Sequence, residues 1–244
     1  MWERLYSTRP SLAWWGTNSE ALQAATDFAR AITIPGVSHS LTQTIWIKYD
    51  SVHWHGDGRY VSVLNWTKTS GNCIRSVYES SSTLLNDLMI EGIQLTAASL
   101  TSGGGIIRFE NFAYSTIRAN YFFGVQVAGT YCIDMRGTWP YGSYYNRIED
   151  NIFGLMAYGL YMGDGANNNI VSHNRFQQAV TAGTGQGILL DGTAAGYISS
   201  NTLIANITEL PGTTMVGIYV GGAADTVAII GHRFESLATG LQIA

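Results

Sequence analysis

Apolar and polar residues recur along this chain in a short phrase that returns every 23 to 31 residues. The phrase consists of an apolar residue, an Asn three positions later and a second apolar residue two positions after that. It occupies 116–122, 147–153, 170–176, 197–203 and 228–234. Its Asn position holds Asn120, Asn151, Asn174, Asn201 and finally His232. A repeat of this length predicts an architecture of stacked, similar coils.

A second phrase, usually a Gly followed by apolar, variable and apolar residues, alternates with the first from Gly105 onward. Its alignment places Ile107, Ile133, Leu160, Ile188, Ile218 and Leu241 in one inward column, and Phe109, Met135, Met162, Leu190, Val220 and Ile243 in the next. A strand that pairs with its counterpart one coil away, at about 4.8 Å, stacks such positions on each other. The pattern therefore predicts a parallel β-helix over residues 32–244.

The recurring Asn is predicted to form a ladder at a turn rather than a catalytic row. Its short side chain tolerates left-handed backbone geometry, and stacked amides can bond from coil to coil.

Residues 1–31 are predicted to form an N-terminal segment and a capping helix. Thr17 and Glu20 have the spacing of a capping box, with Thr17 as the N-cap. The apolar residues placed on one helical face are Ala21, Leu22, Ala25 and Phe28. Short alternating runs then predict strands at "ITIPG", "TIWIKYD", "VHWHGDG" and "SVLNW".

The composition narrows the possible partners. Only 12% of residues are charged and the net charge is −4, so no basic stripe is present to hold nucleic acid. The sequence contains no run of 18 apolar residues, the length that would predict a membrane span. The first residues also lack the apolar core of a signal peptide. We therefore expect a protein made without a cleaved leader. Many Gly, Asn, Ser, Thr and aromatic residues suit a surface that contacts sugars.

Metal and cofactor sites are not expected. Cys73 and Cys132 lack metal-ligand spacing and are predicted to be buried free thiols. His53 and His55 flank a Trp without a third ligand nearby. The stretch 163–169, "GDGANNN", lacks the spacing of a calcium loop.

Residues 19–66 resemble the start of the pectate-lyase-like right-handed β-helices, especially the branch that includes bacteriophage tailspikes. The matching residues are Ala21, Gln23 and Ala25 in the helix, Pro35 and Gly36 in a turn, and Gly56 and Gly58 after a strand. The Tyr that commonly follows Pro-Gly is missing, and the catalytic motifs of the polygalacturonases and secreted pectate lyases are absent. The resemblance implies a homotrimer that binds, and often cuts, bacterial surface polysaccharide, but it carries over no catalytic residue.

Outward-facing columns of the β-helix supply the candidate site. One column holds Arg108, Asp134, Tyr161, Leu189, Tyr219 and Gln242; the column just past the strand holds Glu110, Arg136, Gly163, Asp191, Gly221 and Ala244, with Asp164 beside Gly163. The candidate catalytic residues are Asp164, Asp191, Asp134 and Glu110. The candidate substrate-binding residues are Arg108, Arg136, Trp139, Tyr141, Tyr161 and Tyr219. The aromatic stretch 137–146, which also contains Tyr144 and Tyr145, could form a groove wall or a contact between subunits.

Coil spacing limits the chemistry of these acids. Carboxylates on adjacent coils lie about 5 Å apart, near the separation in retaining glycosidases. Two neighbouring carboxylates would also raise the pKa of one, which gives an acid beside a base. A lyase or epimerase would instead use Arg108 and Arg136 to neutralise a uronate, with Tyr161 as proton donor.

Purely structural roles are alternatives to these catalytic and substrate-binding roles. Arg108 with Asp134, and Glu110 with Arg136, could be ion pairs between adjacent coils. Asp150 and His173 could form an acid–base dyad or a turn pair.

The hypothesis from sequence is a tailspike-like protein in a phage virion that binds and depolymerises a bacterial surface polysaccharide by hydrolysis. The alternatives are a spike that binds the glycan without cutting it, and a lyase or epimerase acting on uronic polymers. The chain stops at "GLQIA", within a coil. We expect partner subunits of a homotrimer, or further chain, to cover that apolar end.

Overall fold

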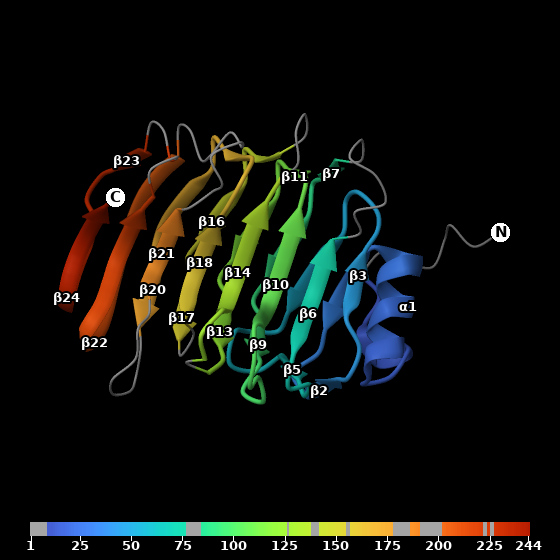
Figure 1. Ribbon diagram of the computed structural model, residues 1–244. Coiled ribbons are helices and arrows are strands. Elements are labelled where there is room, and N and C mark those ends of the chain that lie inside the picture. Colours follow the sequence, from blue (N-terminus) through green and yellow to red (C-terminus); the bar gives the residue numbers. More distant parts are fainter. Residues whose placement is uncertain are drawn as a thin grey trace.

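The strands pair almost entirely with strands one coil away, in parallel and in register (Figure 1). The computed structural model describes residues 9–76, 84–125, 127–137, 142–154, 157–177, 186–190, 202–221, 224 and 227–244, except for the side chains at 202, 203, 205, 207–215, 236 and 238. The architecture is an all-β right-handed parallel β-helix with one short α-helix near the N-terminus. The predicted fold class is therefore confirmed.

Three rows of strands form the faces of the β-helix, and each row is named here after one of its strands. The β10 face contains β3 (Ile45–Ile47), β6 (Gly71–Ser76), β10 (Gly104–Glu110), β14 (Thr130–Arg136), β18 (Tyr158–Met162) and β21 (Gln186–Leu190). The β12 face contains β1 (Ala31–Ile34), β4 (His53–Gly56), β8 (Met89–Glu91), β12 (Thr116–Arg118), β16 (Arg147–Glu149) and β23 (Val227–Ile229). The β13 face contains β2 (Ser38–Leu41), β5 (Val63–Trp66), β9 (Gln94–Thr96), β13 (Tyr121–Phe123) and β17 (Ile152–Gly154).

Later coils run through more than one face without a break. These are β20 (Ile170–Gln177), β22 (Thr202–Val220) and β24 (Arg233–Ile243). A narrow second sheet of β7 (Leu85–Asn86), β11 (Phe112–Ala113), β15 (Ser143–Tyr144) and β19 (Ala166–Asn167) forms the corner between the β10 and β12 faces.

The two predicted inward columns on the β10 face are confirmed position by position. Ile107 pairs with Ile133, which pairs with Leu160, and the register continues through Ile188 and Ile218 to Leu241. All of these are fully buried except Leu241, which is 42% exposed in the last coil. On the β13 face the apolar position after the Asn builds a ring stack, in which Phe122, Phe153 and Phe176 lie with centroids 5.0 and 4.5 Å apart.

The Asn ladder is real. Asn151 donates through Nδ2 to Oδ1 of Asn174 at 3.0 Å and accepts the backbone N–H of Asn120 at 3.0 Å. The left-handed residue is the one before each Asn, namely Ala119, Asp150 or His173. Asp150 and His173 therefore occupy equivalent turn positions, in agreement with the turn interpretation. A second, unpredicted ladder joins Asn146 to Asn169 at 3.0 Å.

One rung of the predicted ladder is wrong. Asn174 bonds to Asn206 at 2.9 Å, so Asn206, not Asn201, continues the ladder. The register of β20 and β22 shifts by one residue here: Ser172 faces Ala205, but Arg175 faces Ile207. The coil of β22 is therefore one residue shorter at this corner and has no counterpart of His173. Asn201 lies outside the described residues. His232 ends the ladder as predicted, since its Nδ1 accepts the backbone N–H of Asn206 at 3.4 Å.

The N-terminal segment covers the first coil (Figure 1). The 3₁₀ helix η1 (Leu12–Trp14) precedes α1 (Ser19–Ala29). Asn18, not Thr17, is the N-cap of α1, because the Asn18 side chain accepts the N–H of Ala21 at 2.9 Å. Phe28 was also wrongly placed on the inner face, for it is 73% exposed while Leu22 and Ala25 are fully buried.

Candidate functional site

The β10 face brings the predicted charged residues together in one outward column. Register places Trp46, Arg75, Arg108, Asp134 and Tyr161 on five consecutive coils. Glu110 and Arg136 form the neighbouring column one coil apart. The column continues through Leu189 and Tyr219 to Gln242.

The charges on this face form an alternating chain of ion pairs. Glu110 accepts from Nε of Arg108 at 2.8 Å and lies 3.6 Å from Arg75. Asp134 accepts from Nε of Arg136 at 2.8 Å and lies 3.8 Å from Arg108. The predicted Arg108–Asp134 pair is present, but the short bonds run within each strand. Both acids are therefore held in ion pairs, but Glu110 pairs with Arg108 and Arg75, whereas Arg136, its predicted partner, pairs with Asp134.

Asp134 is the least accessible of the three candidate acids that the structure describes, because its side chain has no exposed surface. Burial raises the pKa of Asp134 above its usual range, and the hydrogen bond and charge of Arg136 oppose that rise. The side chain of Glu110 is 17% exposed. In this arrangement Asp134 supports the two guanidinium groups rather than contacting a polymer.

Aromatic rings lie along the same face. The guanidinium of Arg136 sits 4.8 Å over the ring of Tyr161, and a Cβ on Gly163 would come within 2.9 Å of that ring. Gly163 thus gives Tyr161 room to lie along the surface. Tyr131 crosses Gly105 to donate to Oδ1 of Asn72 at 2.6 Å. Burial and the nearby Asp134 carboxylate raise the pKa of Tyr131 to about 12, so it stays protonated.

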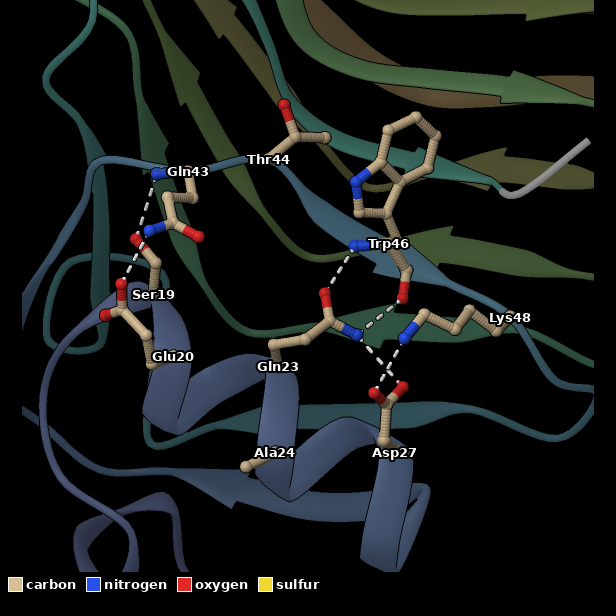
Figure 2. A pocket seen from close by; sticks show the side chains of 9 residues that line it. All are labelled: Ser19, Glu20, Gln23, Ala24, Asp27, Gln43, Thr44, Trp46 and Lys48. Carbon is tan, nitrogen blue, oxygen red and sulfur yellow. Dashed lines mark hydrogen bonds and ion pairs between the residues drawn. The ribbon is translucent and has the colours of Figure 1, made fainter.

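A pocket of about 610 Å³ lies where this face meets α1 (Figure 2). Its lining residues come from α1 and from β3 with its flanking residues: Ser19, Glu20, Gln23, Ala24, Asp27, Gln43, Thr44, Trp46 and Lys48. Both carboxylates are engaged, since Glu20 accepts from Gln43 at 2.7 Å and Asp27 from Lys48 at 2.8 Å. Arg75 lies 5.1 Å over the ring of Trp46, which joins the pocket to the charged column.

The remaining predicted site residues are only partly described. Asp164 is half-buried just past β18, and its carbonyl accepts the N–H of Gly137. Tyr219 is half-buried in β22. Asp191, Trp139 and Tyr141 lie outside the described residues. The pairing of Asp164 with Asp191 and the aromatic wall therefore stay predictions.

A second charged cluster, on the β12 face, was missed. Glu91 accepts from Nδ1 of His55 at 2.8 Å and from Nε of Arg118 at 2.7 Å. Burial raises the pKa of Glu91, but the His55 and Arg118 hydrogen bonds outweigh it, and the pKa falls below its usual range. The coil with Glu91 holds Ile93 at the ladder position, whose backbone N–H bonds Asn120 at 3.0 Å. Ile90 and Leu95 have the spacing of the two apolar residues in the repeating phrase, so they could have identified this coil, and Glu91 with it, from the sequence.

Other features of the described residues concern metals and membranes. Cys73 and Cys132 are buried free thiols, as predicted, and burial raises the pKa of each well above its usual range. In the described part of the chain, no three His, Cys, Asp or Glu side chains gather as a metal site. No helix among those residues has both the length and the apolar character to cross a membrane.

The family model described as "Right handed beta helix region" matches residues 44–206, which is most of the chain. The chain belongs to this right-handed β-helix family. No curated protein sequence matches it.

Similar solved structures show the same fold. Gene product 12 of bacteriophage phi29, in its pre-mature form, is 12% identical over 86% of this chain and 34% of its own length, with a TM-score of 0.62. The tailspike protein of Acinetobacter baumannii phage AM24 is 14% identical over 98% of this chain and 46% of its own length, with a TM-score of 0.59. The catalytic domain of a GH87 α-1,3-glucanase in complex with nigerose is 13% identical over 97% of this chain and 40% of its own, with a TM-score of 0.55. This β-helix chain therefore spans less than half the length of each of them.

Proposed function

We propose that this β-helix protein is a tailspike-like protein of a phage virion that binds a bacterial surface polysaccharide along the β10 face. The observation that carries this proposal is the outward column of Trp46, Arg75, Arg108 and Tyr161, in which the buried Asp134 occupies the coil between Arg108 and Tyr161. Rings on such a row offer stacking surfaces to sugars, and guanidinium groups donate in pairs to carboxylates and hydroxyls.

The charge on the row favours a mildly acidic glycan. Three arginines, Arg75, Arg108 and Arg136, face two carboxylates, Glu110 and Asp134. Arg75 is the least engaged of the three. It reaches Glu110 only at 3.6 Å, and its buried Nε bonds to none of the described residues. A uronate or another acidic substituent beside Trp46 would meet that guanidinium.

The solved structures support the same class of ligand by analogy of fold. One is named a phage tailspike protein and another an α-1,3-glucanase in complex with nigerose. The tailspike-like proposal also includes a homotrimer in the phage tail. Light scattering coupled to size-exclusion chromatography would measure the number of subunits.

Cleavage of the bound glycan is the finer part of the proposal. Asp164 and Asp191, which the alignment of the coils in the sequence places one coil apart, are proposed as the hydrolytic pair. With either residue changed to Asn, release of reducing ends should stop while the protein still binds the glycan. A lyase also releases reducing ends, so the appearance of unsaturated uronate absorbance together with them would identify a lyase instead.

Binding is tested with Arg75→Gln and a matched control. Arg9, in the N-terminal segment, also reaches a single glutamate, Glu91, only at 3.8 Å. Wild type and both variants would be titrated with purified capsular polysaccharides and O antigens. The proposal expects weaker binding of Arg75→Gln and unchanged binding of Arg9→Gln. Failure of the wild type to bind any member, or equal affinities in all three proteins, would contradict it.

A further inference from the structure

The corner next to the β12 face holds a column of left-handed residues on five consecutive coils. Register and backbone bonds align Ser51, Asp87, Tyr114, Tyr145 and Asn168. Their φ angles lie between 51° and 59°. Asp and Asn visit this conformation readily, whereas it is unusual for a bulky residue. Two neighbouring tyrosines at such a corner therefore call for an explanation.

Burial does not supply that explanation. Tyr114 is 63% exposed and Tyr145 is 52% exposed. The two rings stack on each other with centroids 5.1 Å apart and planes 15° apart. Tyr144 adds a third ring, edge-on to Tyr145 at 6.1 Å. The fold thus holds an aromatic platform outward where shorter residues suit the backbone better.

The surroundings of the platform are polar. Asp87 precedes Tyr114 by one coil, and Asn168 follows Tyr145 by one coil. The Asp87 side chain is 60% exposed, and Arg147, two residues beyond Tyr145, is 57% exposed. Apolar ring faces next to carboxylate, amide and guanidinium groups match a sugar, which has an apolar face and a rim of hydroxyls.

We propose that Tyr114 and Tyr145 form a second glycan-binding platform, separate from the β10 face and on the other side of the β11 corner. This inference rests on the proposed function and adds a binding site to it. A sugar residue stacks on the free face of one ring, and Asp87 or Asn168 bonds its hydroxyls. Two rings alone are far smaller than the roughly 800 Å² that each partner buries in a stable protein contact. The platform therefore suits a sugar better than a second copy of the chain.

The test replaces the rings with the residue type that suits the corner. Tyr114→Asn and Tyr145→Asn, singly and together, should leave the melting temperature unchanged or higher, because Asn accepts the left-handed conformation. Tyr60→Asn is the matched control, since Tyr60 is 62% exposed and its ring lies 5.4 Å from the ring of Tyr121 at the β13 face, tilted by 54°. Affinities for purified capsular polysaccharides and O antigens would be measured by titration calorimetry, with light scattering for subunit number.

The platform predicts about tenfold weaker binding in the double variant, as expected for the loss of aromatic stacking, and wild-type binding in Tyr60→Asn. Unchanged affinity in the double variant would overturn the platform and leave the proposed function standing. A changed subunit number would also overturn it, because the rings would then be a contact between copies. Failure of the wild type to bind any glycan would reject the proposed function and the platform together.

Discussion

Gln23 of α1 binds both backbone groups of Trp46 in β3 (Figure 2). Its Oε1 accepts the Trp46 N–H at 2.7 Å, and its Nε2 donates to the Trp46 carbonyl at 3.0 Å. β3 pairs with β6 on its other side. One side chain of the capping helix thus takes the place of a neighbouring strand and closes the open edge that begins the β10 face.

Gln23→Ala should therefore destabilise the first coil. It removes three hydrogen bonds, one to Asp27 and two to the Trp46 backbone, and leaves the Trp46 backbone groups without these partners. The expected loss is about 1–3 kcal/mol. The midpoint of urea unfolding would measure the change. Gln43→Ala is the control, because the Gln43 side chain makes an exposed bond to Glu20. Equal midpoints for the two variants would show that Gln23 does not hold the edge.

Asn151→Ala should destabilise the middle of the β-helix more strongly. The Asn151 amide donates to Asn174 and to the Ile117 carbonyl, and accepts from the backbone and side chain of Asn120. Loss of four buried bonds predicts about 3–5 kcal/mol of destabilisation by thermal or urea unfolding. Asn65→Ala, which removes one bond from Thr96, should cost much less. A small effect for Asn151→Ala would mean that the ladder adds little to stability.

His232 makes the last rung of the ladder sensitive to acid. Burial lowers its pKa to about 4, and its Nδ1 must be unprotonated to accept from Asn206. The folded state therefore binds fewer protons than the unfolded state between this pKa and the ordinary value of about 6.5. Stability should fall across that window as the pH is lowered. His232→Asn should remove this loss, and melting curves at pH 7.5 and 4.5 would show it; a loss that persists would contradict the assignment.

The Glu91 carboxylate should also make the stability of the folded protein depend on pH. Its folded-state pKa is lowered, with the His55 and Arg118 bonds outweighing burial. The stability that Glu91 contributes is therefore present above the ordinary Glu pKa and is lost as the pH falls through the lowered one. Glu91→Gln should be less stable than wild type at pH 7, and the gap should close toward pH 3. A gap that does not depend on pH would mean that the charge of Glu91 is not what stabilises the cluster.

The sequence predicted the fold well because its inward positions repeat. Ile107, Ile133 and Leu160 line up residue by residue, since each must be apolar to fill the shared core. Asn206 was missed because one residue is deleted from its coil, so that Asn206 follows the apolar Ile204 by two positions instead of three. Asn201, which follows Ile198 by three, fits the repeating phrase instead. The repeat therefore predicts the number and order of the coils, but not a deletion within one of them.

The candidate site was predicted in position but not in detail. Arg108 and Asp134 lie on one face as predicted, because adjacent coils keep their register. The complete burial of Asp134 was not predicted, since it depends on how the long side chains of Arg108 and Arg136 fold over it. The proposed tyrosine platform was not predicted from the sequence. Tyrosine is not a residue type that indicates left-handed backbone geometry, so nothing in the sequence marks Tyr114 and Tyr145 as corner residues.

The most direct test of glycan binding is a crystal structure of the protein with an oligosaccharide taken from a polysaccharide that it binds. The account predicts sugar density along β6, β10, β14 and β18, with an acidic or hydroxyl group within hydrogen-bonding distance of Arg75. Sugar density confined to the β13 face, or none on the β10 face at saturating oligosaccharide, would contradict it.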